Sequence, residues 1–201
     1  VFYLVFTIYK FALIRYSVAD HSEINITPEE LAALKDEDLP VYSILVPMYH
    51  EAESIRHVVE SLQKMDYPPE KKEVQLLLEE DDEETRRAAE GLSLPPGFAV
   101  TVVPRSFPRT KPKACNVGLA RARGEFLVIY DAEDQPEPDQ LKKAAAAFRR
   151  VNSRVVCLQC RLNFYNPYQN LLTRWFAAEY SAWFDLSLPG LCALGAVIPL
   201  G

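Results

Sequence analysis

The chain has 201 residues, of which 49% are hydrophobic and 25% charged, and its formal net charge is −6. This composition is ordinary for a globular protein, and the length allows one sizeable domain with its own core. The acidic balance argues against a dedicated nucleic-acid-binding protein, which usually presents a basic face.

Residues 1–18 are expected to be the end of a transmembrane or membrane-associated helix. The stretch VFYLVFTIYKFALIRY is apolar apart from Lys10 and Arg15, but it is shorter than the roughly 20 residues that span a bilayer. It lacks the basic start and cleavage site of a signal peptide. Because the chain starts at Val1 and ends on the apolar GLCALGAVIPLG, we expect a fragment of a longer protein. An amphipathic or buried helix, with Lys10 reaching for solvent, is the alternative.

Residues 19–40 are expected to be a polar linker with one short helix. Thr27 can cap this helix, Pro28 suits its first position and Glu30 completes a capping box. Residues 41–201 are expected to form one domain, within which strand and helix patterns alternate. We predict strands at 41–47, 73–80, 98–104, 125–131 and 154–165, and helices at 51–65, 81–92, 113–124, 138–151 and 167–188.

This alternation, with nearly continuous apolar strands, predicts an α/β fold with a mainly parallel sheet covered by helices on both faces. Cys157 and Cys160, in the apolar run CLQC, are then expected to be buried thiols rather than a metal or redox pair. In such sheets, ligands bind beyond the carboxyl ends of the strands. Four polar or charged loops stand at those ends: PMYHE, EEDDEE, PRSFPRTKPK and DAED.

The DAED loop is the first candidate site. Asp131, Glu133 and Asp134 follow a strand directly, so their carboxylates should crowd into one small volume. Like charges so close favour a bound cation, and Mg²⁺ or Mn²⁺ suits two carboxylates together with phosphate oxygens. A solvated acidic loop that caps the next helix is the alternative. A calcium EF-hand does not fit, because Pro136 and Lys142 stand where that loop needs Gly and Glu.

The other strand-end loops supply further acids and cations. Glu80, Asp81 and Asp82 lie near the tip of the second strand and could accept hydrogen bonds from a base or a ribose, whereas Glu83 and Glu84 suit a helix first turn. Arg109, Lys111 and Lys113 precede a helix start that favours anions, so a diphosphate could bind there; a solvated basic loop is the alternative.

Several common sites are excluded or disfavoured. The chain contains no Gly-rich P-loop and no G-x-G-x-x-G, which disfavours nucleoside triphosphatases and dinucleotide-binding enzymes. His50 and His57 have no third ligand at a spacing that suits zinc.

The segments ILVPMYHEAESI, LLLEEDDEET, PRTKPKACNVGLARARGEFLVIYDAEDQPEPDQL and FYNPYQNLLTRWFAAEYSAWFD together resemble the family 2 inverting glycosyltransferases. The resemblance covers residues 41–201 and is greatest to the bacterial, membrane-embedded cellulose-synthase-like branch. It implies a GT-A fold, truncated here at the C-terminus. It also implies a metal-dependent transferase that moves sugar from a nucleotide sugar, a UDP-sugar, to a growing polysaccharide or other glycan.

The resemblance also implies roles for single residues. DAED would be the D-x-D motif, with Asp131 and Glu133, and Asp134 beside them, facing Mg²⁺ or Mn²⁺ and the diphosphate. The remaining donor-binding residues would be Pro47 and Glu51 at the nucleotide, one of Glu80, Asp81 and Asp82 at the uracil, and Lys111, Lys113 and Asn116 at the diphosphate. His50 replaces the Asn more usual before that Glu. Trp175 and Trp183 would lie toward the acceptor, with core packing as the alternative.

The family's later motifs, an acidic motif with the catalytic base and then Q-x-x-R-W, do not occur in this sequence. We therefore expect this chain alone to bind nucleotide diphosphate weakly and to turn over little or not at all. The resemblance implies the bacterial inner membrane, with the transferase domain in the cytoplasm and no nucleic-acid partner. The alternatives are a non-catalytic scaffold in a membrane complex and a nucleotidyltransferase, although the latter usually carries a Gly-rich basic signature after its first strand.

Overall fold

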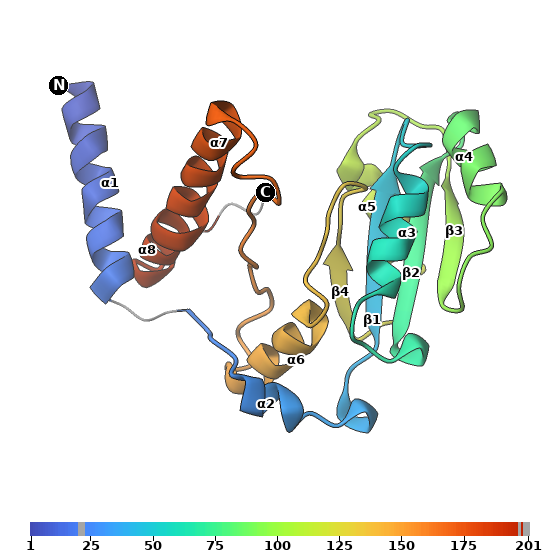
Figure 1. Cartoon of the computed structure of the whole chain (residues 1–201), viewed down its shortest axis with the longest axis horizontal. Helices are drawn as coiled ribbons and strands as arrows, with labels where there is room; N and C mark the ends of the chain where they lie inside the picture. Colours follow the sequence, from blue (N-terminus) through green and yellow to red (C-terminus); the bar gives the residue numbers. More distant parts are fainter. Residues whose placement is uncertain (20–22, 197, 199–201) are drawn as a thin grey trace. The chain divides into compact units, whose positions relative to one another are not determined.

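The computed structural model of the protein describes residues 1–19, 23–196 and 198. The chain divides into two compact units (Figure 1). The sheet unit comprises Ile26–Val151, and the helical unit combines Val1–Asn25 with Asn152–Gly201. All of the predicted donor-binding and metal-binding residues belong to the sheet unit.

A four-stranded parallel sheet forms the centre of the sheet unit. The strand order is β3-β2-β1-β4, so the first strand in the sequence lies between the second and the fourth. The two central strands are almost wholly buried, which explains their continuous apolar sequences. The first four predicted strands are therefore confirmed. Their bounds are β1 (Tyr42–Met48), β2 (Lys72–Glu79), β3 (Phe98–Val103) and β4 (Phe126–Ile129).

Helices cover both faces of this sheet (Figure 1). On one face, side chains of α3, α4 and α6 pack on Ile44, Val46 and Leu76 to form the main core. On the other face, Ala114 of α5 packs with Leu45, Leu77 and Val103. The helical segments of this unit are α2 (Pro28–Ala32), η1 (Asp36–Asp38), α3 (Ile55–Gln63), η2 (Pro69–Lys71), α4 (Glu83–Glu90), α5 (Lys111–Leu119) and α6 (Gln140–Arg150).

The short helix α2 begins with the capping box that the sequence predicts. The Thr27 hydroxyl accepts a hydrogen bond from the Glu30 N–H at 3.2 Å, and the Glu30 carboxylate accepts one from the Thr27 N–H at 2.8 Å. Two of the helix's unpaired amide donors are thereby satisfied. The helix predicted within residues 19–40 is confirmed; residues 20–22 of this linker lie outside the described residues.

The helical unit contains α1 (Phe2–Ala19), α7 (Leu171–Ser181), a π-helical segment η3 (Ala182–Ser187) and α8 (Leu188–Ala193). Helices α1 and α8 touch at backbone level, since a methyl group on Gly190 would come within 2.2 Å of the Leu13 carbonyl oxygen. Helix α1 has a mean hydropathy of 1.3 over 18 residues, and 6% of that window is buried. It is long and apolar enough to cross a membrane.

Two predictions and one alternative for the helical unit are wrong. The described residues 154–165 contain no strand, and Val156 is 88% exposed. Cys157 and Cys160 in that segment are consequently exposed rather than buried. The alternative that Trp175 and Trp183 pack in the core is also wrong, since these side chains are 69% and 41% exposed.

A glycine before β4 offers a test of this packing. A methyl group at Gly124 would lie 2.4 Å from the Ser43 amide nitrogen and 2.8 Å from the Phe126 carbonyl oxygen, and neither backbone atom can move aside. We expect Gly124→Ala to lower the free energy of unfolding by about 1–3 kcal/mol, measured by urea denaturation. At Gly91 the nearest atoms would be 3.6 Å away, so Gly91→Ala should stay within about 0.5 kcal/mol of wild type. Equal effects of the two substitutions would contradict the close approach at Gly124.

Candidate functional site

The site lies at the carboxyl edge of the sheet, where the loops after all four strands meet. Parallel pairing requires this arrangement, because every strand of such a sheet ends at the same edge. The site-bearing loops follow Met48, Glu79, Val103 and Ile129. The acids and the cations of the sequence are thereby brought together from segments that are far apart in the chain.

Three cation–carboxylate pairs connect these loops. Lys111 contacts Asp131 and Arg109 contacts Asp81, so α5 and the loop before it are tied to the ends of β4 and β2. Lys113 Nζ lies 2.8 Å from Glu79 Oε2. These pairs differ in burial: the side chains of Lys113 and Glu79 are 16% and 8% exposed, whereas those of Lys111 and Asp131 are 48% and 43% exposed.

The acids after β2 have separate roles. Glu80 Oε2 accepts a hydrogen bond from the Arg105 N–H at 2.9 Å and thereby holds the loop after β3. Asp82 caps α4, where it accepts from the Thr85 N–H at 3.1 Å and from the His50 N–H at 2.6 Å. Two of the three predicted nucleobase acids thus maintain the fold of the loops.

Asp81 is the acid with unused hydrogen-bonding capacity. One of its oxygens, Oδ2, pairs with Arg109, but Oδ1 is buried and has no hydrogen-bond partner among the described residues. The Arg109 guanidinium also donates to the Tyr49 hydroxyl at 2.9 Å and lies over the Phe107 ring, 5.6 Å from its centroid. A buried acceptor without a donor is costly, so this oxygen suits an N–H group of a ligand.

The pKa of Asp82 lies below its ordinary value of 3.8. Burial by itself would raise this pKa, but the hydrogen bonds from Thr85 and His50 stabilise the carboxylate and outweigh it. The His50 backbone is left-handed at this turn, with φ at 58°. Asn adopts this conformation readily, which explains why an Asn would serve equally well at this position.

Pro47 and Glu51 flank this turn. Pro47 is half-buried within β1, opposite Leu77 of β2. The Glu51 N–H donates to the Thr85 hydroxyl at 3.0 Å, and its carboxylate accepts from the Ser54 hydroxyl at 2.7 Å. Glu51 thus stands in the turn before α3, bonded to Thr85 of α4 through its backbone.

The DAED loop does not gather its three carboxylates. Asp134 Oδ2 accepts from the Asp131 N–H at 2.7 Å and closes a tight turn, while Glu133 is exposed. Burial, above all, raises the pKa of Asp134. No cluster of three or more His, Cys, Asp or Glu side chains suited to a metal occurs among the described residues. The expectation of three crowded carboxylates is therefore wrong, because the turn uses one of them.

The remaining donors still fit a divalent ion. Mg²⁺ and Mn²⁺ are commonly held by one or two carboxylates together with substrate phosphates. Asp131 stands at the end of β4 with an exposed carboxylate, and Glu133 lies two residues further along the same turn. Asp131, with Glu133 as a second donor, would hold the ion beside Lys111.

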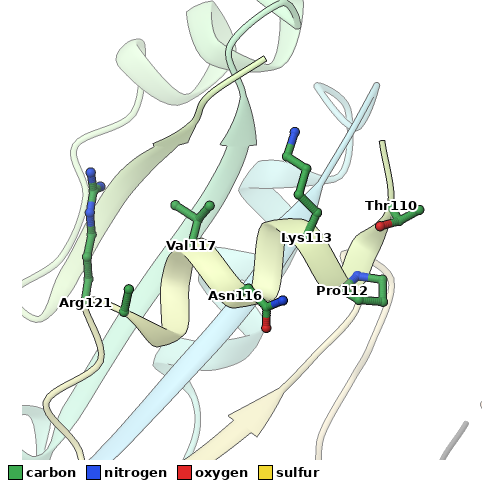
Figure 2. A pocket seen from close by; sticks show the side chains of 7 residues that line it. Thr110, Pro112, Lys113, Asn116, Val117 and Arg121 are labelled. Atoms are coloured by element: carbon green, nitrogen blue, oxygen red, sulfur yellow. The ribbon is translucent and has the colours of Figure 1, made fainter. Parts of the chain in front are cut away.

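A shallow hollow of about 610 Å³ runs along α5 (Figure 2). Figure 2 shows the side chains that border it, ranged along the helix from Thr110 to Arg121. Asn116 is exposed and belongs to this hollow, as does the stem of Lys113. The lining residues are Thr110, Pro112, Lys113, Asn116, Val117, Ala120 and Arg121.

Comparison with known proteins identifies this architecture. The sequence model described as Glycosyl transferase family 2 matches residues 43–193, which is most of the chain and includes every loop of the site. The chain belongs to glycosyl transferase family 2.

Relatives in this family are named glycosyltransferases. The poly(ribitol-phosphate) beta-N-acetylglucosaminyltransferase TarS of Staphylococcus aureus is 28% identical over 121 residues, which are 60% of this chain and 21% of TarS. Glucomannan 4-beta-mannosyltransferase 2 of Arabidopsis thaliana is 26% identical over 157 residues, or 70% of this chain and 28% of the plant protein. The chain thus spans less than a third of either protein.

A solved structure supports the same assignment. The mannosyltransferase PcManGT from Pyrobaculum calidifontis, in complex with GDP-Man and Mn²⁺, matches with a TM-score of 0.51 at 28% identity. The match covers 70% of this chain and 39% of PcManGT. The predicted α/β fold of the GT-A type, with a parallel sheet flanked by helices, is confirmed.

Sequence reasoning missed three residues that shape this family 2 site. The sequence places Glu79 within the second predicted strand, yet its buried carboxylate forms an ion pair with Lys113. Tyr49 and Arg105 bond to Arg109 and Glu80. Glu79 could have been found, because a charged residue that ends a buried apolar strand requires a partner.

The Asp82 cap provides a test of the loop architecture. Asp82→Asn keeps a capping side chain but removes the charge, so we expect it to lower the free energy of unfolding by about 1–2 kcal/mol at pH 7. Because the folded-state pKa is depressed, this stabilisation is fully present above the unfolded value of 3.8 and is lost as pH falls through the lower, folded value. Urea denaturation of both proteins between pH 7 and pH 3 measures the difference.

Glu84→Gln, which removes one charge from the exposed first turn of the same helix, serves as the control and should change the free energy of unfolding by about 0.3–1 kcal/mol at most. A difference between wild type and Asp82→Asn that stays constant down to pH 3 would contradict the assigned role of the Asp82 carboxylate.

Proposed function

We propose that the protein is part of an inverting, metal-dependent glycosyltransferase that moves sugar from a UDP-sugar to a growing polysaccharide or other glycan. The observation that carries this proposal is the layout of the carboxyl edge. The loops at this edge carry an Asp81 oxygen without a hydrogen-bond partner among the described residues, which suits a base. They also carry the half-exposed Lys111–Asp131 pair, which suits a diphosphate.

The nucleoside end of the donor would bind at the loops after β1 and β2. Asp81 Oδ1 would accept an N–H of the base, and Tyr49 and Arg109 would border it. Pro47 and Glu51 would form the neighbouring wall on the β1 side. Glu80 and Asp82 would contribute indirectly, because their carboxylates already hold Arg105 and His50 in place.

The diphosphate end would bind between α5 and the DAED loop. Lys111 would contact the phosphate oxygens, and the amino end of α5 favours the same negative charge. Lys113 would act mainly by anchoring α5 to Glu79, and Asn116 lies further along the helix. A divalent ion held by Asp131 and Glu133 would supply charge neutralisation of the leaving diphosphate.

The names of similar proteins support this proposal. TarS is named an N-acetylglucosaminyltransferase, the Arabidopsis relative is named a mannosyltransferase, and PcManGT is described with GDP-Man and Mn²⁺. We infer UDP rather than GDP as the nucleotide from the family resemblance of the motifs.

We further propose the cellulose-synthase-like, membrane-embedded branch, with the site on the cytoplasmic side of a bacterial inner membrane. The support is α1, whose apolar side chains are widely exposed, including Phe2, Leu4 and Phe11 at 80%, 65% and 68%. Exposed apolar surface on this scale favours a lipid environment.

Nucleotide binding tests the donor site. We expect UDP with Mn²⁺ to bind the wild-type chain in isothermal titration calorimetry, and Asp81→Asn and Asp131→Asn each to weaken binding about tenfold or more, since each removes a charged partner. Glu83→Gln, an exposed acid two residues after Asp81 that pairs with Arg87, is the matched control and should bind like wild type. Tighter binding of GDP than UDP would change the assigned nucleotide, and binding of neither would refute the proposal.

Vesicle flotation tests the membrane assignment. We expect the wild-type chain to float with neutral phosphatidylcholine vesicles and Val5→Glu/Ile8→Glu to remain in the dense fraction, because two carboxylates on the exposed face of α1 oppose insertion. Glu29→Gln, outside α1, should float like wild type. Flotation of the double variant at the wild-type level would contradict a role for α1.

A further inference from the structure

The contact between Lys111 and Asp131 has a consequence for how metal and donor would bind. Lys111 is the first residue of α5 and Asp131 follows β4, so the pair joins the two sides of the proposed diphosphate position. Both side chains are about half exposed, at 48% and 43%. Among the described residues, Asp131 is the one carboxylate within ion-pair distance of Lys111.

The same Asp131 carboxylate is the main donor available to a divalent ion. Asp134 uses its Oδ2 to accept the Asp131 N–H, which leaves Asp131 and the exposed Glu133 as the main carboxylate donors of the loop. An ammonium group and a divalent cation on one carboxylate repel each other strongly at such short range. Lys111 and the metal ion therefore compete for Asp131.

A diphosphate removes this competition. Its oxygens offer Lys111 a new anionic partner next to the helix start, and the flexible four-carbon stem of lysine allows the ammonium group to move. Resting on the proposed function, we infer that Lys111 occupies the metal position at Asp131 in the empty protein. The nucleotide diphosphate draws Lys111 away, so that metal and nucleotide bind cooperatively.

The other two pairs of the site are less able to exchange. Lys113 and Glu79 are largely buried, and Lys113 Nζ also lies 3.5 Å from the Ser106 carbonyl oxygen. The side chains of Arg109 and Asp81 are 30% and 21% exposed, and Arg109 also donates to the Tyr49 hydroxyl. Breaking a buried pair leaves an uncompensated charge, which is strongly unfavourable. An exposed pair contributes little to stability and is easily exchanged. Lys111 is therefore the cation that can move.

The test measures Mn²⁺ affinity directly, from the electron paramagnetic resonance signal of free Mn²⁺, with and without saturating UDP. In wild type, UDP should tighten Mn²⁺ binding about tenfold or more, and by linkage Mn²⁺ should tighten UDP binding equally. Lys111→Met should tighten Mn²⁺ binding without UDP by about three- to tenfold, because the competing charge is gone. The same variant should weaken UDP binding in the presence of Mn²⁺, so that the coupling between the two ligands falls.

Two further variants locate the effect. Arg123→Met removes the same charge from the Arg123–Glu73 pair at the opposite, amino end of the sheet, and should leave both affinities as in wild type. Lys111→Met/Asp131→Asn should lose the tighter Mn²⁺ binding. Circular dichroism melting of each variant verifies that it is folded.

The failure of this inference is distinct from failure of the donor site. If Lys111→Met weakens UDP binding but leaves Mn²⁺ affinity unchanged, Lys111 is only a diphosphate ligand and the inference is overturned while the proposed function stands. Tight Mn²⁺ binding that persists in the double variant would also overturn it, because the metal would then bind elsewhere. If wild type binds neither UDP nor GDP with Mn²⁺, the proposed function fails and the inference with it.

Discussion

The parallel pairing of β1 with β2 and β4 is the constraint on which the rest of the structure depends. It buries the central strands on both faces, so charged side chains can stand only at or beyond the strand ends. It also brings those ends to one edge. The acids after β2 and β4 and the cations before α5 therefore meet, although two helices and two strands separate Asp81 from Asp131 in the sequence. The concentration of charge at this edge is a consequence of the apolar interior.

Burial divides the charges at this edge into a fixed part and an exchangeable part. The fixed part lies around β2, where Glu79 holds Lys113 and Asp82 accepts two backbone N–H groups within the fold. Removing a partner there leaves a desolvated charge, so these contacts are rigid. The exchangeable part is the half-exposed Lys111–Asp131 pair. The proposed donor site thus has a fixed region for the base and an adaptable region for the phosphates. This division would hold the nucleoside in place while the diphosphate binds a metal ion.

The sequence predicts the elements of the sheet unit well, because the apolar strands and the Thr27 capping box are local signals. It does not distinguish Glu80, Asp81 and Asp82, since their roles depend on backbone N–H groups of Arg105 and His50, which only the folded loops bring near. The turn formed by Asp134 was equally hidden, because the residue pattern of a metal loop and of a capped turn is the same. The predicted strand at 154–165 failed for a related reason: a strand forms only when it pairs with another strand, and the local pattern of apolar residues does not show whether that pairing occurs.

The net charge of the protein bears on how the site would attract a diphosphate. At a net charge of −6 the protein as a whole repels a diphosphate, and salt screens this repulsion only beyond about 8–10 Å. Attraction must therefore come from nearby groups. Residues 104–113, PRSFPRTKPK, contain Arg105, Arg109, Lys111 and Lys113 and no acid. Arg109 and Lys113 are committed to Asp81 and Glu79, so within this segment the charge nearest the proposed phosphate position comes from the half-exposed Lys111. The divalent ion that we propose at Asp131 would add a second positive charge there and offset the acidic surroundings of the site.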